Sequence, residues 1–168
     1  PRLWTSILKE NDIKVVQVVS SVNFALKSQD AGVDAIVAEG FEAGGHNGRE
    51  ETTTMTLIPM VKAEIELPLI AAGGIETGSA MLAAIALGAD GVQVGSRFVA
   101  SNEASSHPSF KQEVVRATEG STLLTLKEIT PVRMLKNSFF QKIILRFLYK
   151  IGARFLFFES SHEARRKN

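Results

Sequence analysis

Four short apolar runs recur along the chain. They span residues 13–19, 34–40, 67–74 and 90–98. Near-continuous apolar runs of this length are typical of strands buried on both faces of a parallel sheet. Parallel strands need long crossover connections, and the segments between the runs have helical spacing. The pattern therefore predicts an α/β fold made of repeated β/α units.

The helical segments between the runs carry start and stop signals. One begins near Val22, and another covers 55–65, where Pro59 is expected to lie in the first turn because proline is tolerated there. A third covers 79–88, with Ser79 as the expected N-cap and a glycine at its end. The segments "AGVDAIVAEG" and "LGADGVQVGS" resemble each other, which is consistent with stacked β/α units.

The pattern changes after residue 98. The segment "HPSFKQEVVRATEG" predicts a helix with its proline near the start, whereas "TLLTLKEITPVRML" is ambiguous. We expect the domain to cover 1–135 and residues 136–168 to form an amphipathic helix and a polar tail. A stripe of Phe140, Ile143, Ile144, Phe147, Leu148 and Ile151 marks that helix. Packing on the domain or on a second subunit is favoured over attachment to a membrane surface.

Composition excludes several functional classes. The 168 residues suit one domain, and a net charge of +1 gives no reason to expect nucleic acid as a partner. The chain has no cysteine, which excludes disulfides, zinc–thiolate sites and thiol nucleophiles. No apolar run approaches the roughly 20 residues of a membrane span, and the first residues do not resemble a secretory leader. We therefore expect a cytoplasmic protein without membrane contact.

Glycine-rich turns follow three of the predicted strands. They contain Gly44 and Gly45, Gly73 and Gly74, and Gly95 with Ser96. In parallel β/α folds, ligands bind at the carboxyl ends of the strands. Glycine lets the backbone approach a ligand closely, and successive N–H groups there can bind an anion. The spacing predicts a ligand that carries a phosphate group.

One of three histidines lies in the first of these turns. Because imidazole exchanges protons near neutral pH, His46 is the candidate acid or base. Glu39 ends the preceding strand and could bind a ligand hydroxyl or orient the loop, whereas Glu42 could equally be a solvated charge. Gln93 is expected inside the last strand, facing the barrel interior and a cofactor. The hydroxyls of 52–54 are expected to cap a helix. No metal site is predicted.

Four ordered motifs together resemble the FMN-dependent nitronate monooxygenase family. They are "VDAIVAEGFEAGGHNG", "PLIAAGGIETG", "ALGADGVQVGSRFVAS" and "HPSFK", and the resemblance covers about 13–135. The flavin-dependent enoyl-acyl-carrier-protein reductases are close relatives that share these motifs. The resemblance implies a TIM-type (β/α)8 barrel with FMN at the carboxyl ends of its strands. Such a barrel takes about 250 residues, so the chain is expected to supply about the last four β/α units.

The resemblance also assigns roles to individual residues. It implies that backbone N–H groups of Gly73, Gly74, Gly95 and Ser96 hold the FMN phosphate. Gly44 and Gly45 would lie against the flavin, Gln93 near the cofactor, and His46 would be the active-site base. The implied partners are a small-molecule substrate and O2. Because half a barrel exposes two strand edges, we also expect either the missing N-terminal half or self-association.

Three further functions stay open at this point. The first is an NAD(P)H-dependent enoyl-acyl-carrier-protein reductase that uses FMN. The second is an inactive or phosphate-ligand-binding barrel fragment. The third is a barrel enzyme acting on a sugar phosphate without flavin, because the glycine turns alone would suit it. No residue of the sequence decides among them.

Overall fold

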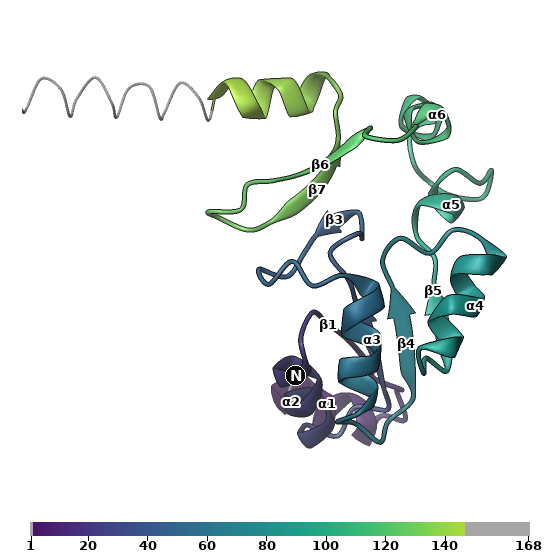
Figure 1. Cartoon of the computed structure of the whole chain (residues 1–168). Coiled ribbons are helices and arrows are strands. Elements are labelled where there is room, and N and C mark those ends of the chain that lie inside the picture. Colours follow the sequence, from purple (N-terminus) through teal and green to yellow (C-terminus); the bar gives the residue numbers. More distant parts are fainter. Residues whose placement is uncertain (1, 147–168) are drawn as a thin grey trace, which may run out of the picture.

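The computed structural model describes residues 2–146, which form a parallel sheet and a smaller antiparallel sheet (Figure 1). The elements are α1 (Arg2–Glu10), β1 (Val16–Val19), α2 (Val22–Asp30), β2 (Ala35–Glu39), β3 (Gly45–His46), α3 (Thr54–Lys62), β4 (Leu69–Ala72), α4 (Gly78–Ala86), β5 (Gly91–Gln93), α5 (Ser96–Val99), α6 (Pro108–Arg116), β6 (Thr122–Thr125) and β7 (Val132–Leu135). The predicted α/β class and the order of strands and helices are confirmed.

The parallel sheet has the strand order β1-β2-β4-β5, and helices α2, α3 and α4 form the crossovers. All three strand pairs are parallel, with Val18 opposite Val37 and Ala38 opposite Ala71 in register. The core lies between the sheet and its helices. Its largest fully buried apolar side chains are Ile36, Leu57, Ile58, Val61 and Leu69. The predicted burial holds for the central strands β2 and β4, which lie between other strands and under α3. It is wrong for the edge strands, because Val16 and Val18 of β1 are half exposed and β5 has no buried residue.

The antiparallel sheet has the order β3-β7-β6 and lies over the end of the parallel sheet to which β4 points (Figure 1). Strand β3 comes from the loop after β2, whereas β6 and β7 form a hairpin far along the chain. This hairpin is the segment "TLLTLKEITPVRML", which the sequence left ambiguous. Its pairing with β3 places the loop after β2 under a cover made by the later part of the chain.

Two details of the helices differ from the sequence prediction. Pro59 lies inside α3, not in its first turn. The carbonyl of Met55 loses its helical partner there, but Met55 is 69% exposed, so that side of the helix faces solvent. The N-cap of α4 is Thr77, whose side chain accepts a hydrogen bond from the N–H of Ala80, and not Ser79.

The far end of the described chain is helical over residues 138–146. Phe147, Leu148 and Ile151 of the predicted amphipathic stripe lie outside the described residues, so the proposed division at residue 135 stays a prediction. Within residues 2–146, none of the helices has the length and apolarity needed to cross a membrane.

The repeated Gly-x-Asp pattern has a structural role. Asp34 precedes β2 and accepts a hydrogen bond from the N–H of Val15 at 2.8 Å, while its own N–H donates to the Val15 carbonyl. Asp90 precedes β5 and exchanges the same pair of bonds with Leu69. These backbone bonds, assisted by lysines, hold the pKa of both carboxyl groups below the usual value. Each aspartate therefore fastens the start of one strand to its neighbour.

Replacing either aspartate should destabilise the fold in a pH-dependent way. Because the folded-state pKa is lowered, the ionised carboxylate stabilises the fold at neutral pH, and this contribution is lost as pH falls through the folded pKa. We expect Asp34→Asn and Asp90→Asn to lower the Tm at pH 7 by a few degrees, on the order expected for losing one charge-assisted hydrogen bond. The difference from the wild type should shrink below about pH 4. Asp30→Asn, on exposed helix surface, removes the same charge as a control; an equal loss there would contradict the assignment.

Candidate functional site

The loop from Gly40 to Gly48 follows β2 and carries the candidate histidine. Its first residue continues the parallel sheet, because the N–H of Gly40 donates to the carbonyl of Ala72 at 2.9 Å. Its last part pairs with the hairpin, where Gly45 lies opposite Arg133 and His46 opposite Val132. The loop therefore connects the two sheets and is fixed at both ends by backbone hydrogen bonds.

The carboxylate of Glu42 binds the start of α3. It accepts hydrogen bonds from the N–H of Thr54, at 3.0 and 3.2 Å, and from the Thr54 hydroxyl at 3.1 Å. The side chain of Thr53, the N-cap, makes no capping bond. Glu42 is thus not a solvated charge, and it satisfies a helix N–H that the threonines were expected to cap. A negative charge is favourable at this end of a helix.

The Thr54 side chain is the point where three segments meet. Its Oγ1 lies 2.9 Å from the carbonyl oxygen of Gly73 and 3.2 Å from that of Ala72, in addition to its contact with Glu42. A Cβ added to Gly40 would lie 2.1 Å from this oxygen, and one added to Gly73 would lie 2.8 Å from it. Glycine is therefore required at both positions because the backbones of β2, α3 and β4 converge on one hydroxyl.

Two further residues hold the loop. The side-chain amide of Asn47 donates to the carbonyls of Ala43 and Gly45, and its backbone N–H donates to Pro131 at 2.9 Å. Arg133 on β7 donates through Nε to the carbonyl of Phe41 at 3.1 Å. Its guanidinium also lies over the Phe41 ring, 5.1 Å from the centroid. The loop is thus constrained along its whole length by residues distant in sequence.

The glycine turns open into one large cavity of about 1080 Å³, at the upper end of the range for ligand pockets. Of the residues predicted from sequence, this cavity is lined by Glu39, Gly44, Gly45, Gly73, Gln93, Gly95 and Ser96. They come from the ends of β2, β4 and β5 and the loops that follow. The structure therefore brings the loops after three strands together, as the parallel arrangement requires.

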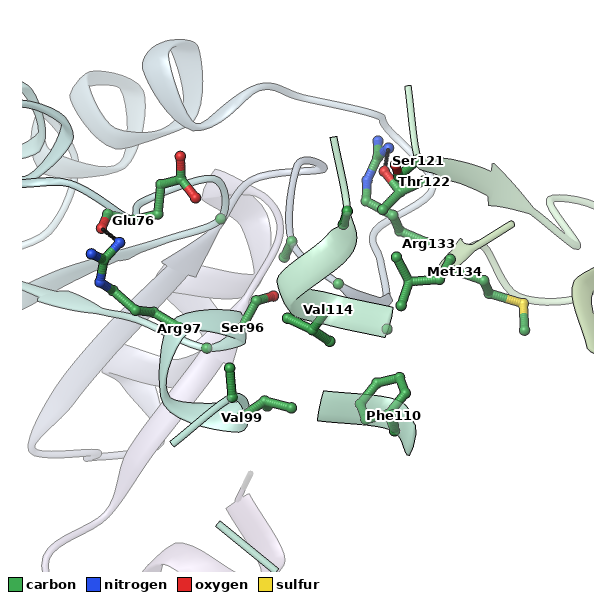
Figure 2. A pocket seen from close by; sticks show the side chains of 18 of the residues that line it. Glu76, Ser96, Arg97, Val99, Phe110, Val114, Ser121, Thr122, Arg133 and Met134 are labelled. Atoms are coloured by element: carbon green, nitrogen blue, oxygen red, sulfur yellow. Dashed lines mark hydrogen bonds between the residues drawn. The ribbon is translucent and has the colours of Figure 1, made fainter. Parts of the chain in front are cut away.

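The other wall of this cavity is apolar. Figure 2 shows Val99, Phe110, Val114 and Met134 on it, contributed by α5, α6 and β7. Arg97 lies at the rim and donates to the carbonyl of Glu76 at 3.0 Å (Figure 2). Its guanidinium is thus bound to backbone, not to another charge. The cavity pairs a glycine-rich wall with an apolar one.

Three predicted residues lie differently from what the sequence suggested. Gln93 is exposed at the cavity, whereas a buried amide was expected. Gly74 does not line the cavity; a Cβ added there would meet the Cβ of Glu42 at 3.1 Å. His46 lines a second cavity of about 500 Å³, together with Asn47 and Pro131. The glycine turns and the imidazole therefore face neighbouring cavities.

The two residues of β3 border different cavities. Gly45 and its partner Arg133 line the large cavity, whereas His46 and Pro131, which precedes β7, line the smaller one. The imidazole is exposed, and within residues 2–146 no hydrogen bond to it is formed. His46 is thus open to a small molecule that enters the second cavity.

Glu39 lines both cavities and is the residue between them. Its side chain is half-buried, and this burial raises the pKa of the Glu39 carboxyl above its usual value. A carboxyl group that retains a proton more readily can donate a hydrogen bond as well as accept one. Among the residues that the structure describes, no cluster of His, Cys, Asp and Glu side chains is arranged to hold a metal ion.

Sequence reasoning missed Thr54 and Arg133. The "TTT" run drew attention to Thr54, but only as a helix cap, because its contacts with Ala72 and Gly73 depend on tertiary packing. Arg133 lies in the ambiguous segment and acts on a residue 92 positions earlier. No local pattern signals either contact.

Parallel strands joined by helices, with a cavity at their carboxyl ends, define the class of β/α-barrel proteins. Residues 3–153 match the nitronate monooxygenase family, and the chain belongs to that family. A probable nitronate monooxygenase of Staphylococcus saprophyticus is 37% identical over 147 residues, covering 81% of this chain and 41% of that protein. The predicted resemblance is therefore confirmed.

Two solved structures place the fold. FabK from Thermotoga maritima is 44% identical, with a TM-score of 0.82, over 92% of this chain and 50% of that one. A nitroalkane oxidase from Streptomyces ansochromogenes is 28% identical, with a TM-score of 0.74, over 83% of this chain and 43% of that one. The chain thus spans about half the length of these relatives, and its fold is part of a TIM-type barrel, as predicted.

Removing the Thr54 hydroxyl should destabilise the junction that joins the loop to β4. We expect Thr54→Val to lower the free energy of unfolding by about 1–3 kcal/mol, because the carbonyl of Gly73 loses the hydroxyl that donates to it. Thr54→Ser keeps the hydroxyl and should cost less. Urea unfolding measures both. The matched control is Thr53→Val, since the hydrogen bond of the Thr53 hydroxyl is to the exposed Thr56 side chain. Equal losses at the two positions would show that the junction is unimportant.

Proposed function

We propose that the chain is part of an FMN-dependent oxidoreductase that oxidises alkyl nitronates with O2. The observation that carries this proposal is the shared cavity, into which the loops after β2, β4 and β5 open beside an apolar wall. Membership of the nitronate monooxygenase family supports the choice of substrate.

The cavity suits FMN in two respects. At Gly44, Gly45 and Gly95, an added Cβ would meet no atom within 4 Å, so the backbone there is open to a ligand. Gly73 has a φ of +103°, which lets its backbone adopt a turn that other residues disfavour. We assign binding of the FMN phosphate to Gly73, Gly95 and Ser96, and Gly74 belongs to the same turn as Gly73. We assign contact with the flavin ring to Gly44 and Gly45. Glu39 and Gln93 would bind its polar atoms.

FMN supplies the redox chemistry when bound, accepting electrons from the substrate and passing them to O2. The protein positions the substrate and moves protons. We assign His46 the role of base toward a neutral nitroalkane: its free ring nitrogen takes the proton from the carbon beside the nitro group, and the electron pair of that C–H bond remains as the nitronate. Glu39 lies between the two cavities and would orient the substrate toward both the FMN site and His46.

A second candidate is an NAD(P)H-dependent enoyl-acyl-carrier-protein reductase that uses FMN. The four sequence motifs favour it, because the flavin-dependent enoyl-acyl-carrier-protein reductases share them with nitronate monooxygenases. In that reaction a hydride would pass from the nicotinamide by way of FMN to the enoyl thioester. A phosphate-binding module without catalysis is the remaining alternative.

One spectroscopic experiment on the full-length protein separates these functions. The proposal predicts flavin absorbance near 450 nm, which anaerobic NADH or NADPH bleaches slowly and an alkyl nitronate reduces quickly. Rapid bleaching by the nicotinamide instead would establish the reductase. A colourless protein that rejects added FMN would eliminate both.

The role of His46 has its own internal control in the same assay. His46→Ala should slow turnover of a neutral nitroalkane roughly 10²-fold or more, because general-base catalysis is lost. Turnover of the pre-ionised nitronate should change little, since it needs no proton removal, and flavin content should remain. If both substrates slow equally, His46 is not the base.

We also propose that the sheet edges of this chain pair with further strands. Strands β1 and β5 end the four-stranded sheet, and Val16 and Val18 on β1 are 50% and 47% exposed. A TIM barrel closes with eight strands, so the partner is either the rest of the protein or a second copy of this chain.

Sedimentation of the 168-residue chain alone tests this pairing. We expect a mass above that of the 18.2 kDa monomer, because exposed edges associate. Val18→Lys should shift the population toward monomer, and Lys14→Glu, just before the strand, serves as a control for charge. A stable wild-type monomer at high concentration would contradict the proposal.

A further inference from the structure

The pairing of β3 with β7 decides which cavity receives His46. Strand β3 has only two residues, and its register places Gly45 opposite Arg133 and His46 opposite Val132. Because side chains alternate along a strand, a slip of one residue would turn the imidazole to the opposite face of the sheet, away from the second cavity. The position of His46 therefore depends on what holds this register.

Strand β3 itself does little to specify its register. Gly45 has no side chain to pack, and both of its residues are exposed. Short strands with glycine and without a buried face are prone to slippage. Residues outside β3 must therefore fix its register on β7.

Arg133 provides contacts in several directions at once. Its backbone pairs with Gly45, its Nε donates to the carbonyl of Phe41, and its Nη1 lies 3.3 Å from the Thr122 hydroxyl (Figure 2). The guanidinium also covers the Phe41 ring. Arg133 thus binds the first part of the loop, the last part of the loop and the neighbouring strand β6.

We infer that Arg133 is a positioning residue that fixes the register of β3 on β7 and so directs His46 into the second cavity. Moving β3 by one residue while Phe41 stays bound would require the intervening loop to change length, which Glu42 and Asn47 resist through their own bonds. The planar guanidinium can donate in two directions and stack on an aromatic ring, whereas a lysine ammonium offers a single point charge.

Other contacts between the loop and the hairpin do not replace Arg133. Asn47 donates its backbone N–H to Pro131, and Arg49 donates to the carbonyl of Ile129 at 2.9 Å. Both lie on the far side of His46, so they do not connect Phe41 to β7. The Asn47 amide is instead a reporter, because a slip of β3 would break its bond to Pro131.

Hydrogen–deuterium exchange tests the inference without flavin. In Arg133→Met we expect the Asn47 amide to exchange at least tenfold faster than in the wild type, with intermediate exchange in Arg133→Lys. The core amide of Ile36, which donates to Pro68, should be unchanged. The matched control is Arg97→Met, which removes another arginine that lines the large cavity and donates to a carbonyl, but does not touch β3.

The imidazole gives a second readout. The His46 ring resonance, identified by its loss in His46→Gln, should broaden or split in Arg133→Met, while that of His107, which caps α6, stays sharp. A general destabilisation of the fold in Arg133→Met would disturb both histidine rings and the Ile36 amide together, and that result would overturn the inference. Wild-type exchange and a single sharp His46 signal in Arg133→Met would overturn it as well.

If Arg133→Met does not fold, Arg133→Lys and Thr122→Val carry the test. Lysine can donate to one acceptor but cannot donate in two directions as the guanidinium does. We therefore expect the Asn47 amide to exchange at least threefold faster, while the Ile36 amide is unchanged. Thr122→Val removes one acceptor and should give a smaller increase. Wild-type exchange in Arg133→Lys would overturn the inference. The catalytic importance of this positioning rests on the proposed function, but either result stands independently of flavin binding.

Discussion

The Thr54 hydroxyl is the contact on which the arrangement of the site depends. Oxygens from Glu42, Ala72 and Gly73 lie within 3.2 Å of it, and the close approach excludes a Cβ at Gly40 and Gly73. Without this junction, the loop after β2 and the turn after β4 would lose a shared side-chain contact and would depend on the backbone bond from Gly40 to Ala72. A buried hydroxyl can have this role because unpaired acceptors in a packed interior are costly. The geometry of the ligand cavity therefore follows from the packing of one small side chain.

The second constraint is the short antiparallel sheet that covers the strand ends. It divides the open end of the barrel into two cavities and exposes glycine backbone to one and an imidazole to the other. Glu39 contacts both, and burial raises the pKa of its carboxyl. This division suits the proposed reaction, in which a bound cofactor and a proton acceptor would approach the same substrate from different sides.

The sequence predicted the order of the parallel sheet well, because short apolar runs separated by helical segments of this length have few alternatives to parallel strands. It also identified the glycine turns, since strand order alone brings the carboxyl ends together. It could not predict the hairpin of β6 and β7, where "TLLT" is largely exposed and the pairing with β3 is made across the chain. It placed the cap of α4 on Ser79 instead of Thr77, because both residues suit an N-cap and lie two positions apart. It left open whether Glu42 is a solvated charge, because the N–H that Glu42 binds belongs to another element.

The pairing of His46 with Val132 has a consequence for how the chain matures. During synthesis, the residues of β1, β2, β4 and β5 leave the ribosome well before those of β7. The parallel sheet can thus assemble while the histidine loop still lacks its partner strand. Contacts between residues so far apart in sequence form late, because closing a long loop is entropically costly. A nascent chain that ends between residues 97 and 131 would contain the three glycine turns, yet it would have no strand to orient the imidazole.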